Sequence, residues 1–295
     1  MEIELVRPYG FCSGVRRTVG LVERLLRERG QLYCFGELIH NLEEVARLAA
    51  LGLRTVSSLE ELPIEGAGKR FLIRAHGLPP QILEEVKQRG YQIVDGTCPR
   101  VLAAHSEALR LAAEGYRLVL VGHREHPELA GLLGAVGGRA EVVLTPEELS
   151  FRPGDRLGVL SQTTLLPEQF TAVVAAAARQ VRELKAVNTL CQETLRRQEA
   201  VREAACRVEL MLVIGGRNSS NTARLAEIAA RYTGCYHIES PNQLERRWLM
   251  GKHRIGISGG TSTPETSLRA VQGEIERLMG GVNDGKEDGR VRREQ

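Results

Sequence analysis

Residues 96–122 read GTCPRVLAAHSEALRLAAEGYRLVLVG, and this stretch decides the predicted fold. Its cysteine, Cys98, comes directly before a segment with the apolar spacing of an amphipathic helix. A short apolar run follows and ends at Gly122, 24 residues after the cysteine. The stretch therefore predicts a helix and then a buried strand, the order found in α/β proteins.

The same arrangement occurs twice more in the chain. Cys12 stands in GFCSGVRRTVGLVERLLRERG, and Cys191 stands in TLCQETLRRQEAVREAACR. The strand-like runs that follow them end at Gly36 and Gly215, again 24 residues after the cysteine. The cysteines are separated by 86 and 93 residues, so we infer an internal triplication.

A second strand and a polar turn complete each repeat. The runs RFLIRAHGLPP, DRLGVLSQTTLLPEQ and HRIGISGGTSTPE pass from apolar residues through small polar ones to a proline and a helix. We predict an α/β fold of three similar domains with mainly parallel sheets, at 1–96, 97–188 and 189–280, and a disordered tail at 281–295. Because ligands bind beyond the carboxyl ends of parallel strands, we expect the polar turns to meet on one pseudo-threefold axis.

The composition limits the classes of partner. The formal net charge is only +3 and 4% of residues are aromatic, which argues against a nucleic-acid surface. The apolar runs are strand-sized and MEIELVRPYG lacks the features of a signal peptide, so we expect no membrane contact and a cytoplasmic protein. No GxGxxG follows a strand, so electrons, if they are used, must come from another protein.

The candidate metal ligands are the three repeated cysteines: Cys12, Cys98 and Cys191. A structural zinc site usually takes four protein ligands, whereas three thiolates can hold a four-iron four-sulfur cluster and leave one iron free as a Lewis acid. Three inert buried cysteines are the alternative. The remaining cysteines have no counterparts at matching offsets, so we expect them to be packing residues: Cys34, Cys206 and Cys235.

Polar residues also recur at matching offsets. Four residues after the strand glycines stand His40, His126 and Ser219, and the second turns carry His76, Thr163 and Ser262. The segment from Asn218 through Ser219 and Ser220 to Asn221 surrounds a predicted helix N-terminus, which indicates either a phosphate cradle or ordinary capping. The histidines and Ser262 could add hydrogen-bond donors to a multiply charged anion.

Glu128 is the candidate proton donor. Pro127 suits the first helical position, which leaves Glu128 in the first turn, near the expected axis. A buried carboxyl group with a raised pKa could protonate a departing oxygen, whereas compensation of the helix dipole is the alternative. We expect His123 and Glu125 either to be solvated or to lie behind the residues that contact a ligand. A zinc hydrolase that uses His123, His126 and Glu128 is a further hypothesis.

The motifs occur in a specific order from about residue 5 to residue 280: PYGFCSGV, GELIHN, RAHG, GTCP, HPE, SQTT, LCQETLRRQ, RNSSN and GGTSTPE. This series resembles that of the 4-hydroxy-3-methylbut-2-enyl diphosphate reductase family, which acts last in the non-mevalonate isoprenoid pathway. The resemblance implies a trefoil of three α/β domains around one four-iron four-sulfur cluster per chain. It also implies that the three cysteines hold the cluster and that its unique iron takes the substrate hydroxyl.

The resemblance further implies a reductive dehydroxylation that yields isopentenyl and dimethylallyl diphosphate, with ferredoxin or flavodoxin as electron donor. Glu128, with Thr163 and His126, would relay the proton. The residues implied to bind the substrate are His40, His76, His126, Thr163, Ser219, Ser220, Asn221 and Ser262.

Three positions depart from the family pattern. Ala104 stands where a lysine usually precedes the histidine, here His105, and Gly96 replaces the alanine of DAT. Glu193 stands where an alanine is common. If its carboxylate turned inward, it would disfavour further negative charge on a cluster, which leaves open a non-catalytic iron–sulfur or phosphate-binding sensor of the same fold.

Overall fold

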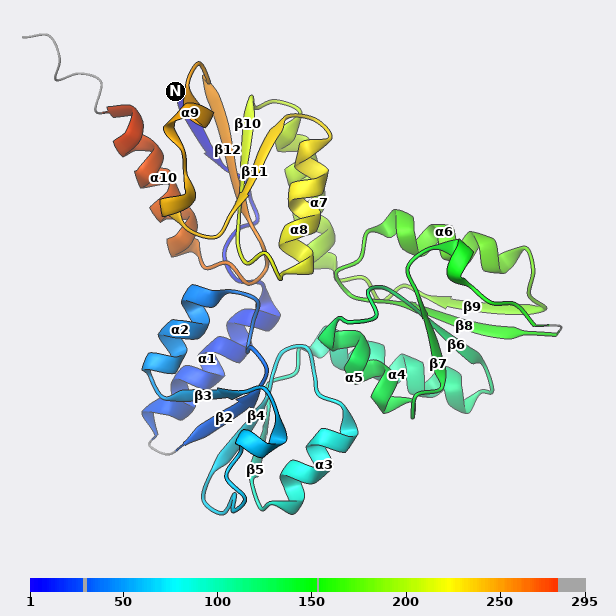
Figure 1. Cartoon of the computed structure of the whole chain (residues 1–295). Helices are drawn as coiled ribbons and strands as arrows, with labels where there is room; N and C mark the ends of the chain where they lie inside the picture. The colour runs from blue at the N-terminus through cyan, green and yellow to red at the C-terminus, as the bar shows by residue number, and fades with distance from the viewer. Residues whose placement is uncertain (29–30, 153, 281–295) are drawn as a thin grey trace, which may run out of the picture.

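The computed structural model describes residues 1–28, 31–152 and 154–280, which form three lobes around a common centre (Figure 1). Each lobe contains a four-stranded sheet, and every strand pair in the three sheets is parallel. The predicted α/β fold with three parallel sheets is therefore confirmed. The predicted tail at 281–295 lies outside the described residues. Among the described residues, no helix is both long and apolar enough to cross a membrane.

The first lobe has the strand order β3-β2-β4-β5. Its elements are α1 (Ser13–Arg27), β2 (Leu32–Phe35), α2 (Leu42–Ala50), β3 (Leu53–Val56), η1 (Leu59–Glu61), β4 (Arg70–Ile73), α3 (Pro80–Gln88) and β5 (Gln92–Asp95). Helix α1 buries Val15, Val19 and Val22, which are spaced to lie on one helical face. This face packs against β2, so the helical period predicted after Cys12 directs α1 onto the sheet.

The second lobe repeats this plan with the strand order β7-β6-β8-β9. Its elements are α4 (Pro99–Ala113), β6 (Arg117–Val121), α5 (Pro127–Ala135), β7 (Ala140–Val143), η2 (Pro146–Glu148), β8 (Arg156–Ser161), α6 (Pro167–Ala178) and β9 (Glu183–Val187). Figure 1 shows α6 on one face of the sheet and α4 and α5 on the other. Because helices cover both faces, strands β6 and β8 are apolar and buried almost throughout.

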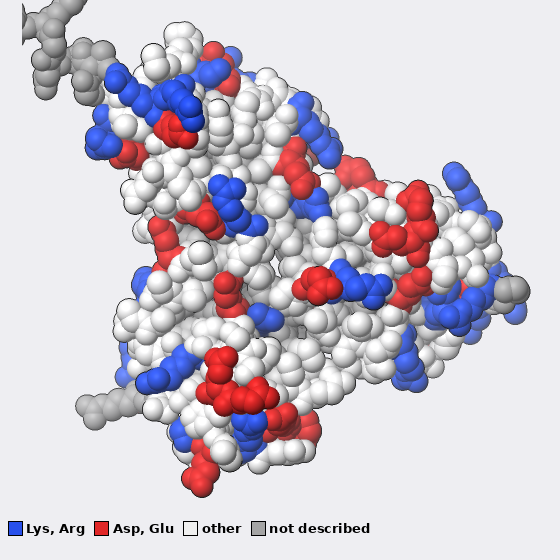
Figure 2. Space-filling view, in the orientation of Figure 1, with Lys and Arg blue, Asp and Glu red and all other residues white. Residues whose placement is uncertain are grey.

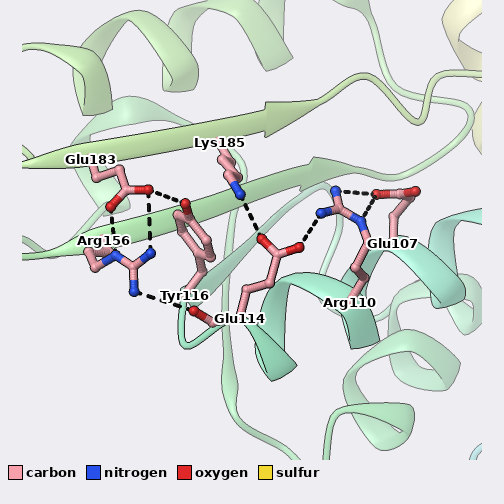
Figure 3. A network of polar contacts seen from close by, with 7 residues as sticks. All are labelled: Glu107, Arg110, Glu114, Tyr116, Arg156, Glu183 and Lys185. Carbon is pink, nitrogen blue, oxygen red and sulfur yellow. Dashed lines mark hydrogen bonds and ion pairs between the residues drawn. The ribbon is translucent and has the colours of Figure 1, made fainter.

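A polar network covers the outer edge of the second sheet, along β9 (Figure 3). Lys185 contacts Glu114 at the end of α4 at 2.6 Å, and Glu183 contacts Arg156 at 2.7 Å and accepts from the Tyr116 hydroxyl. These ion pairs are half exposed, so each adds little stability. Their charges instead keep the free edge of β9 from pairing with other strands.

The third lobe has the strand order β11-β10-β12-β1. Its elements are β1 (Glu2–Leu5), α7 (Gln192–Ala205), β10 (Leu210–Ile214), α8 (Ser220–Ala230), β11 (Gly234–Ile238), η3 (Pro241–Gln243), α9 (Arg246–Leu249), β12 (Arg254–Gly259) and α10 (Glu265–Gly280). Strand β1 pairs with β12, although the sequence places it in the first unit. It cannot join the first sheet at the corresponding position beside β4, because β5 already occupies that edge.

The three edge strands β1, β5 and β9 play equivalent parts. Each closes the sheet of one lobe and leads through a cysteine into the first helix of the next lobe: β1 to α1, β5 to α4 and β9 to α7. The cysteines therefore lie at the junctions between lobes. Beyond the reassignment of β1, the boundaries at 96/97 and 188/189 stay predictions.

Candidate active site

The three repeated cysteines occupy equivalent positions, each as the N-cap residue of a helix. The edge strand before each cysteine pairs with an inner strand of its sheet: β12, β4 or β8. In each case the cysteine backbone N–H donates to a backbone carbonyl in the turn that follows this inner strand. These pairs are Cys12 with Thr261 at 3.1 Å, Cys98 with Ala75 at 3.0 Å and Cys191 with Thr163 at 2.8 Å. The same backbone contact thus places each thiol at the centre of the molecule.

One cavity of ≈ 80 Å³ lies where the three lobes meet, which is several times the roughly 15 Å³ that a single water needs. Figure 2 shows that the surface dips at this centre and that charges of both signs are interspersed over the face in view. The structure brings to this cavity all the residues that the family resemblance implies for the cluster, the substrate and the proton relay: Cys12, His40, His76, Cys98, His126, Glu128, Thr163, Cys191, Ser219, Ser220, Asn221 and Ser262. Two other candidates, Asn218 of the proposed phosphate cradle and His123 of the zinc hypothesis, do not line it.

Two of the three cysteine thiols, those of Cys12 and Cys98, lie beside Gly14. A β-carbon at Gly14 would lie 2.6 Å from the Cys98 sulfur, which is too close, and 3.9 Å from the Cys12 sulfur, which is ordinary contact, so glycine is needed here to leave room for the Cys98 thiol. Burial raises the pKa of the Cys12 thiol to about 11 and also raises the pKa of Cys98. The thiolate forms therefore need a positively charged group beside them.

This donor set fits a group of several metal atoms better than a single ion. Within residues 1–28, 31–152 and 154–280, no three His, Cys, Asp or Glu side chains are close enough to share one metal ion. Three thiols from three helices nevertheless line one cavity, and thiolates are the ligands that iron–sulfur clusters take. Cys12, Cys98 and Cys191 could therefore hold such a cluster between them.

Three histidine rings cluster on another wall of the cavity. The centroids of His40 and His76 are 4.6 Å apart, and His126 lies 6.0 and 5.7 Å from them. Burial lowers the pKa of all three, that of His126 to about 3. The His126 Nδ1 accepts from the Glu128 N–H at 3.2 Å, so the neutral ring carries its proton on Nε2.

Several buried polar atoms around the histidines have no hydrogen-bond partner. They include both ring nitrogens of His40, Nδ1 of His76 and both side-chain polar atoms of Asn221. His40 Nδ1 lies 3.5 Å from a carboxylate oxygen of Glu37, within the range of an ion pair but without a hydrogen bond. Buried polar groups without partners are costly, so this wall is suited to a ligand with many acceptor oxygens.

The structure confirms ordinary capping at the helix N-terminus at Ser219. Its hydroxyl oxygen accepts from the Thr222 N–H at 3.3 Å, which is N-capping, and its own proton is free to be donated. Capping does not account for the unpaired Asn221 amide, which lies beside it in the cavity. Ser262 donates to the His40 carbonyl at 3.0 Å, which ties the third lobe to the first.

Glu128 and Thr163 form a buried pair. Glu128 is 2% exposed, and its two carboxylate oxygens accept from the Thr163 N–H and hydroxyl, both at 2.7 Å. Burial raises the pKa of Glu128 to about 7, although the Thr163 hydrogen bonds oppose the rise. A carboxyl group of this kind can exchange a proton near neutral pH.

The arrangement around His123 does not suit a zinc ion. Its Nε2 is in contact with the Arg224 guanidinium of the third lobe, which can only donate, so the imidazole nitrogen is already engaged beside a positive charge. Neither His123 nor Glu125 lines the central cavity, and Glu125 is exposed. The three residues of the hydrolase hypothesis therefore do not face one site.

Glu193 turns away from the cavity. Its carboxylate accepts from the N–H and hydroxyl of Ser13, the first residue of α1, and lines a different groove. Although burial opposes it, the Ser13 hydrogen bonds and nearby guanidinium groups lower the pKa of Glu193. Glu193 was the residue that suggested a non-catalytic sensor. Its carboxylate instead caps the N-terminus of α1 and so links the third lobe to the first.

Sequence reasoning missed several residues that line the cavity: Gly14, Arg100, Thr164, Thr194 and Thr261. Thr164 and Thr261 lie in the predicted polar turns, directly beside the predicted site residues Thr163 and Ser262. Their position could therefore have indicated that they line the cavity. Nothing in the spacing indicated Arg100. The expectation that Cys206 is a packing residue is wrong, because its side chain is exposed.

The chain is similar to known proteins over nearly its whole length. A family model described as LytB protein matches residues 3–276. Two relatives are named 4-hydroxy-3-methylbut-2-enyl diphosphate reductase. The protein from Aquifex aeolicus strain VF5 is 39% identical, over 95% of this chain and 98% of the relative. The protein from Dehalococcoides mccartyi strain CBDB1 is 38% identical, over 96% of this chain and 100% of the relative.

Two solved structures share the fold. A terminal enzyme of the non-mevalonate pathway, (E)-4-hydroxy-3-methyl-but-2-enyl diphosphate reductase, is 39% identical with a TM-score of 0.68, over 94% of this chain and 100% of that one. The E-1-hydroxy-2-methyl-but-2-enyl-4-diphosphate reductase from Plasmodium falciparum is 25% identical with a TM-score of 0.86, over 93% and 88%.

Proposed function

This chain belongs to the LytB protein family and is an enzyme, and from that premise we propose that it reduces 4-hydroxy-3-methylbut-2-enyl diphosphate to isopentenyl and dimethylallyl diphosphate. One observation carries the proposal. Three thiols, a cluster of unpartnered histidine nitrogens and a buried carboxyl group with a pKa of about 7 line the same small cavity. Metal ligands, anion donors and a proton donor are the three requirements of this reaction.

We propose that Cys12, Cys98 and Cys191 hold one four-iron four-sulfur cluster. When bound, the cluster supplies electrons and a Lewis-acidic iron. Gly14 contributes by leaving space for the Cys98 thiol, and the N-terminal ends of α1, α4 and α7 direct their positive dipole ends toward the thiolates.

The diphosphate would bind at the wall where polar atoms of His40, His76 and Asn221 lack partners, together with neighbouring polar side chains of the cavity. The proposed binding residues are His40, His76, His126, Ser219, Ser220, Asn221, Thr163 and Ser262. A bound anion would favour the protonated forms of the histidines, whose pKa values burial lowers in its absence. Binding would therefore add charge-assisted hydrogen bonds and remove the cost of the unpaired atoms.

Glu128 would deliver the proton that lets the hydroxyl leave as water. The Thr163 hydroxyl can reverse from donor to acceptor when Glu128 is protonated, so the pair holds either protonation state without moving. The reaction breaks one C–O bond and consumes two electrons and two protons, one of which enters the released water. The Nε2–H of His126 would help to orient the substrate beside Glu128.

The two electrons would come from ferredoxin or flavodoxin, as the resemblance to the family implies, and this fits the lack of a dinucleotide fingerprint in the sequence. Purification without oxygen, followed by iron and sulfide analysis and by product analysis with dithionite as reductant, tests the proposal. We expect about four irons and four sulfides per chain, and both isomeric products. Protein that contains iron and binds the diphosphate but forms neither product would contradict it.

A further inference from the structure

A second depression, on the outer surface, adjoins the three cysteines. It has a volume of ≈ 1150 Å³. We call it the arginine groove, defined by Arg7, Pro8, Tyr9, Arg100, Gln192, Glu193, Arg196, Glu265 and Arg269. Arg100 also lines the central cavity, so the groove and the cavity share a wall.

Each cysteine lies within three residues of a groove residue. Tyr9 precedes Cys12, Arg100 follows Cys98, and Gln192 follows Cys191. Apart from Arg100, no groove residue lines the cavity. A molecule in the groove would therefore come close to all three thiols without covering the proposed substrate-binding side chains.

The groove is positively charged. It is lined by four arginines and two glutamates, and both glutamates are already engaged, Glu193 by Ser13 and Glu265 by Arg269 at 3.2 Å. In the described part of the chain, Arg7, Arg100 and Arg196 form no ion pair. The groove thus keeps positive charge available to an outside partner.

Two other surface grooves each contain one arginine that is paired within the chain. Arg47 lines one of them and contacts Glu23 and Glu44, both at 2.6 Å. Arg117 lines another and contacts Glu141 and Asp155 at the same distance. Internal pairing neutralises these two arginines, but the same grooves also contain Arg27, Arg139 and Arg152, which form no ion pair among the described residues. What distinguishes the arginine groove is that its unpaired arginines lie beside the three cysteines.

Tyr9 holds part of the positive surface in place. The guanidinium carbons of Arg7 and Arg269 lie 5.3 and 6.0 Å from its ring centroid, within the range of cation–π contacts. These side chains are therefore partly ordered before a partner arrives, which lowers the entropy lost on binding.

We propose that the arginine groove is the docking surface for an acidic one-electron carrier protein that serves the site at the three cysteines, a proposal that rests on the proposed function. Each encounter moves one electron from the carrier, which is oxidised, to the group at the cysteines, which is reduced. Two encounters supply the two electrons of one dehydroxylation. Electrostatic attraction speeds such short-lived encounters, whose interfaces are small.

The test compares Arg7→Glu/Arg196→Glu with the parent holoenzyme, using reduced acidic ferredoxin in one arm and dithionite in the other. With ferredoxin at low ionic strength, we expect kcat/KM to fall by about tenfold or more. The loss should shrink near 1 M salt, where the screening length is about 3 Å. With dithionite, turnover and the KM for the diphosphate should match the parent.

Arg139→Glu/Arg179→Glu is the matched control, because it changes the net charge by the same amount through two exposed arginines outside the groove. Equal ferredoxin kinetics for parent and groove variant, or an equal loss in the control, would overturn the docking proposal. If the parent turns over no diphosphate with dithionite, the proposed function fails, and titration with oxidised ferredoxin then decides the docking site. If ferredoxin binds more weakly to the groove variant but not to the control, the docking site is supported. If it binds the parent and the groove variant equally, the docking site is refuted.

Discussion

Replacing Glu128 by glutamine is expected to lower activity and, above neutral pH, to raise stability. The amide keeps the size of the carboxyl group and can accept the Thr163 N–H, but it cannot donate a labile proton. Loss of a general acid typically slows the chemical step by about 10²–10⁴-fold. We expect kcat to fall within this range while the KM for the diphosphate changes little.

The stability effect follows from the pKa of Glu128. Its rise from 4.5 to about 7 on folding corresponds to about 3 kcal/mol. The folded state holds this proton more tightly than the unfolded state, so the stabilising contribution is fully present below pH 4.5 and is lost as the pH rises through about 7. Glutamine stays neutral and avoids this loss. Above about pH 8 the variant should therefore be more stable than the parent by up to about 3 kcal/mol.

Urea unfolding of the metal-free chain, followed by circular dichroism from pH 4.5 to 8.5, measures this difference. Other titrating groups cancel when the variant is compared with the parent at each pH. Glu125→Gln is the control, because it removes one carboxylate from an exposed position three residues away. A free-energy difference between Glu128→Gln and the parent that does not change with pH would refute the reasoning.

Other substitutions test separate parts of the site. Cys98→Ala should lose most bound iron and the associated visible absorption, since one of three ligands is gone; iron analysis after anaerobic purification measures this, and full retention contradicts the ligand assignment. Gly14→Ala should also lose iron, because its β-carbon would lie 2.6 Å from the Cys98 sulfur, whereas Gly20→Ala, with open space around it, should not. Asn221→Ala should raise the KM for the diphosphate with a smaller change in kcat, as determined by steady-state kinetics with dithionite; an unchanged KM would remove it from the binding site. Glu193→Ala should lower stability by about 1 kcal/mol through loss of the Ser13 hydrogen bonds and leave the dithionite-driven kcat near that of the parent.

The regular spacing of the repeat predicted the elements and side chains that all three lobes share. The offset of 24 residues from cysteine to glycine placed equivalent helices and strands in all three lobes, and the second offset placed His40, His126 and Ser219 around one cavity. Contacts specific to one pair of lobes were not predictable in this way. The Ser13–Glu193 cap and the contact between His123 and Arg224 each join a pair of residues that has no equivalent pair in the other repeats, so no internal comparison indicates them.

The pairing of β1 with β12 shows what a linear repeat leaves undetermined. Every cysteine follows an edge strand that closes the sheet of another lobe, and among the described residues no lobe comes before the first. The first edge strand can pair equivalently only by joining the last sheet, which closes the lobes into a ring and sets the Cys12 N–H against the Thr261 carbonyl. The position of Cys12 therefore depends on residues near both ends of the described chain. Cys98 and Cys191 depend only on neighbouring lobes, so closure of the ring is what brings the third thiol to the others.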